Sequence, residues 1–173
     1  MAPTPRNDRE DGGRPFDRDA CMNPETLFSL CNGLALVGWL LLVFLPHWRW
    51  TAQLVLSGLI PLLLATVYLV LIVAFFGRTE GGFGSLAQVA LLFKQPYAIL
   101  AGWVHYLAFD LFVGAWETRD SQRLGISRWL AIPCLVLTFL LGPIGLLGYH
   151  VIRWFWSRHH PDFVENARSL PLA

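Results

Sequence analysis

The sequence predicts an all-α membrane protein: a bundle of four transmembrane helices with a short interfacial helix between the second and the third. Two observations predict this fold class. Of the 173 residues, 55% are hydrophobic and only 14% are charged, whereas soluble domains carry roughly 25% charged residues. In addition, four apolar segments reach the ~20 residues that a helix needs to cross the ~30 Å hydrocarbon core of a bilayer. We therefore expect lipid to surround most of the chain.

The residues before the first apolar segment are expected to form a flexible tail. Residues 1–22 mix Arg, Asp, Pro and Gly with almost no large apolar side chain, so they cannot bury enough surface to offset ordering. They match neither a signal peptide nor an acidic-poor transit peptide, so we expect a bacterial cytoplasmic (inner) membrane as the location. The membrane domain is predicted over residues 23–156, followed by a C-terminal tail over residues 157–173.

The first two spans have clear limits. The first is predicted over residues 25–45, after Asn23-Pro24, which read as an N-cap followed by a proline at the first helical position. The second is predicted over residues 54–76, carries no charged side chain and ends at Gly77. Each is expected to cross the membrane as one helix.

The third and fourth spans are predicted over residues 97–117 and 129–156. The third contains ionisable side chains, whereas the fourth is apolar as far as Tyr149. Between the second and third spans, several glycines precede the apolar run SLAQVALLFK. Because this run is too short to span and too apolar to lie in water, we expect a loop with a short interfacial helix there.

The distribution of Lys and Arg predicts the orientation. With four spans, both tails and the long loop share one side, and they hold nine of the thirteen basic residues. The other side holds Arg49, Arg119, Arg123 and Arg128. We therefore expect a multi-pass protein with both termini in the cytoplasm. Tryptophans are expected to mark the two interfaces. Those on the non-cytoplasmic side are Trp48, Trp50, Trp116 and Trp129, and those on the cytoplasmic side are Trp154 and Trp156.

Composition and motifs exclude several function classes. Thirteen Lys and Arg against twelve Asp and Glu leave no basic excess for nucleic-acid phosphates, so no DNA or RNA partner is expected. Three scattered cysteines suit neither a disulfide framework nor a zinc cage. Nucleotide-binding motifs, HExxH and histidine clusters are absent, so no metal and no cofactor are predicted.

Ionisable side chains inside an apolar span are costly, so each is a functional candidate. Asp110 lies ~20 Å into the third span and His105 ~12 Å. At ~100° per residue, one stripe of this helix holds Trp103, Tyr106, Asp110 and Glu117. His105 lies ~140° from Asp110, on a stripe with Phe109. Joint action of His105 and Asp110 therefore needs a ligand between helices.

Each candidate also has a structural explanation. Asp110 can be a neutral or paired carboxyl used for assembly, His105 a hydrogen-bonded core histidine, and Glu117 a solvated acid at the membrane boundary. In the first span, Glu25 can complement the helix dipole, and Asn32 can bridge helices. Three further polar residues are expected to bond local backbone carbonyls and to be structural: Thr66, Tyr68 and Thr138.

Three strings of this sequence resemble the neoxanthin-synthase-like family, the abscisic-acid-deficient type of small four-helix membrane protein of plastids and bacteria. They are NPETLFSLCNGLALVGWLLL, LLFKQPYAILAGWVHYLAFDLFVGAWETRD and LAIPCLVLTFLLGPIGLLGY. The resemblance covers about residues 23–150, and the string of the third span is its most specific part. It implies a bound carotenoid and a redox-neutral conversion of violaxanthin into neoxanthin. Another carotenoid or a retinoid-like polyene is an equally open substrate.

The implied chemistry is cofactor-free isomerisation, in which an epoxide oxygen is protonated and an adjacent polyene carbon loses a proton. Asp110 is the predicted acid, and His105 or Glu117 the predicted base. The predicted substrate-binding residues are Trp103, Tyr106, Phe109, Asn32 and Glu25. The alternative is a non-catalytic transmembrane subunit of a larger bacterial membrane complex, for example a photosynthetic assembly, with a structural or pigment-binding role.

Overall fold

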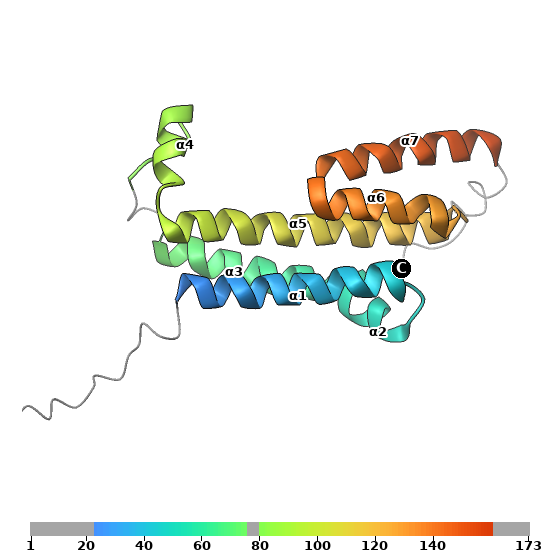
Figure 1. The fold of residues 1–173 in the computed structure, drawn as a ribbon, viewed down its shortest axis with the longest axis horizontal. Helices are drawn as coiled ribbons and strands as arrows, with labels where there is room; N and C mark the ends of the chain where they lie inside the picture. Colours follow the sequence, from blue (N-terminus) through green and yellow to red (C-terminus); the bar gives the residue numbers. More distant parts are fainter. Residues whose placement is uncertain (1–22, 76–79, 161–173) are drawn as a thin grey trace, which may run out of the picture.

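The computed structural model describes residues 23–75 and 80–160, and within these ranges the regular structure is entirely helical. Three long helices lie side by side, and a helical pair packs on the third of them (Figure 1). The long helices are α1 (Pro24–Phe44), α3 (Leu59–Phe75) and α5 (Pro96–Arg123), and the pair is α6 (Arg128–Leu141) and α7 (Pro143–His159). The predicted tail over residues 1–22, and residues 161–173 of the other tail, lie outside the described residues.

Within residues 23–75 and 80–160, three helical segments are long and apolar enough to cross a membrane: Pro24–Phe44, Arg49–Phe75 and Pro96–Arg123. The predicted start of the first is confirmed, because the Asn23 side chain accepts a hydrogen bond from the Glu25 amide at 3.0 Å and Pro24 opens the helix. The described part of the chain is therefore an all-helical membrane protein whose apolar helices contact the lipid bilayer.

The second span is not one regular helix. It begins with a short α2 (Arg49–Thr51) and a π-helical turn, η2 (Ala52–Leu56), before α3. Pro61 explains the interruption, because its ring lacks an N–H and clashes with the carbonyl four residues earlier, at Ser57. The backbone therefore opens just before Leu59.

The predicted fourth span over residues 129–156 is wrong as a single helix. Helix α6 ends at Leu141, and α7 starts at Pro143 and packs back along α6. Gly142 makes the turn with φ +50°, a left-handed conformation that favours glycine. A Cβ on Gly145 would lie 2.1 Å from the Thr138 amide nitrogen, so only glycine lets the two helices approach this closely. The segment is a helical hairpin whose turn lies beside the middle of α5 (Figure 1).

Because of this hairpin, the start of α1 and the end of α7 lie at opposite ends of the bundle. The indole of Trp156, near the end of α7, donates a hydrogen bond to the Leu124 carbonyl at the end of α5 (3.0 Å). Arg153 contacts Asp120, one turn before the end of α5. The prediction that both ends of the membrane domain lie on one side is therefore wrong, because residues 128–159 form a hairpin and not a fourth crossing.

A short helix, α4 (Leu86–Leu92), lies between the second and third spans as predicted. The Ser85 hydroxyl caps this helix by accepting a hydrogen bond from the Gln88 amide at 3.3 Å. Figure 1 shows α4 across the bundle axis at the start of α5. Helix α5 is central, because its buried side chains Leu100, Val104 and Leu111 join the core formed with α1 and α3. Helix α5 therefore has neighbours on several faces, and its polar residues are divided among them.

Candidate functional site: an aromatic cavity beside His105

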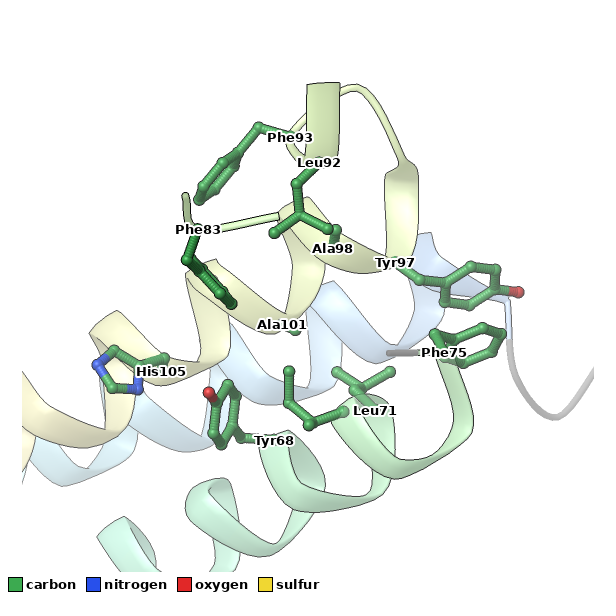
Figure 2. A pocket seen from close by; sticks show the side chains of 12 residues that line it. Tyr68, Leu71, Phe75, Phe83, Leu92, Phe93, Tyr97, Ala98, Ala101 and His105 are labelled. Carbon is green, nitrogen blue, oxygen red and sulfur yellow. The ribbon is translucent and has the colours of Figure 1, made fainter. Parts of the chain in front are cut away.

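A cavity of about 240 Å³ lies between α3, α4 and α5. Apolar and aromatic side chains form most of its wall, and Figure 2 shows them converging from the three helices and the loop before α4. The lining residues are Tyr68, Leu71, Ile72, Phe75, Phe83, Leu92, Phe93, Tyr97, Ala98, Ala101, Gly102 and His105. Such a wall suits an apolar ring rather than a charged or strongly hydrated ligand.

Two polar side chains lie together at one end of the cavity. His105 of α5 and Tyr68 of α3 have ring centroids 5.2 Å apart, and Figure 2 shows the Tyr68 hydroxyl on the side of His105. Phe109, one turn further along α5, packs on the imidazole with a centroid distance of 4.6 Å. A ligand in the cavity therefore meets an imidazole and a phenol together, which are groups able to accept and donate protons.

Aromatic rings close the other end and cover the top. Phe75, the last residue of α3, stacks on Tyr97 with centroids 3.9 Å apart and ring planes 8° from parallel. Phe83 and Phe93 lie above the cavity in Figure 2, and both are substantially exposed on their outer faces. Because α4 and the loop before it supply this cover, the short helix has a definite structural role at the cavity.

The two carboxyls of the third span lie away from the cavity. Asp110 lies against the hairpin turn, where a Cβ on Gly142 would be 3.1 Å from its Oδ1 atom. Its Oδ2 atom is buried and has no hydrogen-bond partner within the described part of the chain. Glu117 is completely buried and accepts hydrogen bonds from the Thr138 hydroxyl of α6 at 3.0 and 3.2 Å. Both carboxyls therefore face the α6–α7 hairpin, as their shared stripe predicts.

A third acid on this side of α5 was not a sequence-based candidate. Asp120 accepts hydrogen bonds from the Tyr149 hydroxyl at 2.8 Å and from Arg153 Nε at 2.7 Å, both from α7. The ion pair ties the second helix of the hairpin to α5. The structural alternative for Glu117, a solvated acid at the membrane boundary, does not hold, because this hairpin covers the side chain.

The predicted substrate-binding residues fall into separate groups. The Trp103 indole donates a hydrogen bond to the Asn32 amide oxygen at 3.1 Å and so joins α5 to α1. Tyr106 lies beside Trp103, and its hydroxyl is 3.4 Å from the Phe139 carbonyl of α6. Phe109 is on the His105 side, and Glu25 is exposed at the start of α1. The eight predicted site residues therefore do not form one site.

Within the described residues, no three His, Cys, Asp or Glu side chains are grouped as a metal ion would need. Three cavity residues are not among the sequence-based candidates: Tyr68, which was expected to be structural, and Phe75 and Tyr97 of the aromatic wall. A signal was present, because Tyr68 is the only ring-bearing polar residue of the second span. Its pairing with His105 depends on the register between α3 and α5, which one sequence does not reveal.

Comparisons with known proteins give one match. The family model described as ABA DEFICIENT 4-like matches residues 26–149. No curated protein and no solved structure matches the chain. The matched region begins in α1 and ends in α7, so it contains both His105 with its cavity and the carboxyls beneath the hairpin. The chain belongs to the ABA DEFICIENT 4-like family.

Proposed function

We propose that this protein holds the oxygenated end ring of a carotenoid-like polyene in the aromatic cavity and isomerises it without a cofactor. One observation carries the proposal: His105 and Tyr68 lie together at one end of a cavity whose remaining wall is mostly apolar. Its volume of about 240 Å³ is below the ~300–1,000 Å³ of pockets for drug-sized ligands, so it suits one end of a long molecule. The polyene chain would then extend into lipid.

The His105–Tyr68 pair suits the proton transfers of a redox-neutral epoxide opening. The Tyr68 hydroxyl gives its proton to the epoxide oxygen as a ring C–O bond breaks, and His105 takes a proton from the adjacent polyene carbon. The electron pair of that C–H bond forms the new double bond, so the substrate gains and loses no electrons. The imidazolium then returns its proton to the neighbouring phenolate, which restores both groups.

In this proposal, Asp110 and Glu117 hold the hairpin rather than react. Glu117 already has a hydroxyl partner in Thr138 and no access to a ligand. Asp110 lies against the α6–α7 hairpin, whereas His105 faces the cavity beside α3. A substrate ring in the cavity therefore cannot contact both side chains. The assignment of the acid therefore moves from Asp110 to Tyr68. The Asn32–Trp103 hydrogen bond suits the packing of α1 on α5.

The test is turnover of an epoxy-carotenoid such as violaxanthin by the purified protein, with products separated by chromatography. His105→Gln and Tyr68→Phe should each lower turnover by about 100-fold or more, the contribution typical of a general acid or base. Both variants should retain bound polyene, because the apolar wall is intact. Asp110→Asn is the control and should keep turnover. If Asp110→Asn is inactive while His105→Gln is active, the reaction belongs to the hairpin face and the proposal is wrong.

A second candidate is a non-catalytic subunit that binds a polyene inside a larger membrane complex, such as a photosynthetic assembly in a bacterial cytoplasmic membrane. It is favoured by the positions of Asp110 and Glu117, which lie beneath the hairpin against Gly142 and Thr138 rather than at the cavity. The two functions differ in one measurement. A polyene that copurifies and is never converted, by wild-type protein and His105→Gln alike, supports the subunit.

A further inference from the structure

One end of the bundle concentrates the arginines of the described chain. This end, where α1 and α5 end, α6 begins and α7 ends, is called the arginine end. It carries Arg49, Arg119, Arg123, Arg128, Arg153 and Arg158. Of the described acidic residues, only Glu117 and Asp120 lie here. Glu117 is buried, and Asp120 is paired with Arg153, so the surface of the arginine end is strongly positive.

Tryptophans accompany these arginines. The rings at this end belong to Trp48, Trp50, Trp116, Trp129, Trp154 and Trp156, which is six of the eight in the chain. Arg158 lies over the Trp154 ring at 3.9 Å, and Arg49 lies 5.6 Å from the Trp50 ring. Exposed tryptophans lie at the headgroup level of a bilayer, with their apolar faces toward the hydrocarbon. The arginines are therefore held at the depth of lipid phosphates.

The opposite end is different. Among the described residues there, Lys94 is the one Lys or Arg. The segment that precedes α1 in the sequence contains four arginines and five acidic residues, and the segment that follows α7 contains one arginine and two acidic residues. The hairpin creates this asymmetry, because it brings Arg153 and Arg158 of α7 back to the end that already holds Arg49 and Arg119. A straight fourth span would have divided them between the two interfaces.

We propose that the arginine end is a docking surface for anionic phospholipid headgroups. Guanidinium groups bind phosphate oxygens in a bidentate manner, and each basic residue near an anionic leaflet adds attraction. Because anionic lipids enrich the cytoplasmic leaflet, the arginine end faces the cytoplasm and α1 starts on the other side. This orientation is opposite to the one that the Lys and Arg count gives for four spans.

Lipid preference is measured by quenching of tryptophan fluorescence in reconstituted vesicles. Tryptophan fluorescence reports on the arginine end, because most tryptophans lie there. Phosphatidylglycerol and phosphatidylcholine with the same brominated chains are compared at equal mole fraction. Brominated phosphatidylglycerol should quench more, and raising NaCl from about 0.05 to about 0.5 M should reduce the difference, because salt screens exposed charges. Equal quenching by the two lipids at low salt overturns the proposal.

The variant Arg49→Gln/Arg119→Gln/Arg158→Gln removes three of the six arginines and should lower the preference. It spares Arg128, which donates to the Val43 and Phe44 carbonyls at the end of α1, and the paired Arg153. Lys94→Gln, at the opposite end, is the control and should leave the preference unchanged. An undiminished preference after the triple substitution, with the same circular dichroism as the wild type, contradicts the assignment to these arginines.

The orientation is tested independently by cysteine labelling in intact cells. The native Cys31 and Cys134 are buried, so Cys21→Ser gives a suitable background. Ser127→Cys, in the exposed turn between α5 and α6, should react with a membrane-impermeant maleimide only after lysis. Glu80→Cys, exposed before α4, should react in intact cells. The reverse pattern shows that the arginine end faces outward and overturns the inference.

Discussion

Replacing Thr138 by valine tests whether Glu117 holds the α6–α7 hairpin on α5. The substitution keeps the shape of the side chain beside Gly145 and removes the hydroxyl that donates to both Glu117 carboxyl oxygens. Because Glu117 is completely buried, no water replaces the lost donor. Leaving a buried polar group unsatisfied costs about 1–3 kcal/mol. For a chain of this size, 1 kcal/mol corresponds to about 2–4 °C, so the apparent Tm should fall by about 2–12 °C.

The assay is thermal unfolding of the detergent-solubilised protein, followed by circular dichroism at one fixed scan rate. Thr66→Val is the matched control, because the Thr66 hydroxyl is exposed and bonds only its own helix, at the Leu62 carbonyl (2.8 Å). It should change the Tm by much less. If Thr138→Val unfolds at the wild-type temperature, or if both variants change the Tm equally, the Glu117–Thr138 hydrogen bond does not stabilise the packing of the hairpin on α5.

Two further predictions concern the same hairpin. Gly145→Ala should separate α7 from α6 and lower the apparent Tm by more than Gly148→Ala, because a Cβ on Gly145 would lie 2.1 Å from the Thr138 nitrogen whereas one on Gly148 has only Cys134 Sγ at 3.8 Å. Equal unfolding temperatures for the two variants would contradict the close approach. Asp120→Asn should lower the free energy of unfolding by about 1–2 kcal/mol. This loss lies between the ~0–1 kcal/mol of exposed ion pairs and the ~3–5 kcal/mol of buried ones, because the Arg153 side chain is 42% exposed. Denaturant unfolding measures this loss, and Arg153→Gln in the Asp120→Asn background should add little.

The sequence predicts the helical class and most span limits because these depend on local signals. The N-cap Asn23, the following Pro24 and an unbroken apolar run place α1 correctly. The same signals fail at residues 129–156, where hydropathy cannot distinguish a straight span from two helices folded on each other. The Gly142-Pro143 pair is compatible with either a kink in one helix or a turn between two helices. The close Gly145–Thr138 packing that favours the turn is a tertiary contact, which the sequence does not reveal.

The candidate site was predictable only in part. The helical period correctly places Asp110 and Glu117 on one face and His105 on another. Periodicity does not say what faces each stripe, so it could not show that the hairpin covers the carboxyls or that α3 brings Tyr68 to His105. The cover from Phe83 and Phe93 depends on the path of the loop and α4, for which the sequence holds no register signal.

Filling the aromatic cavity tests the central claim most directly. Ala98 lines the cavity from the first turn of α5, so Ala98→Phe places a ring in the space proposed for the substrate. Ala65→Phe is the control, because Ala65 is exposed on α3 and is not among the lining residues. The measurement is the amount of polyene retained by each purified variant, in samples with wild-type circular dichroism. We expect Ala98→Phe to lose the polyene and Ala65→Phe to retain it; full retention by Ala98→Phe would contradict the claim that the cavity is the binding site.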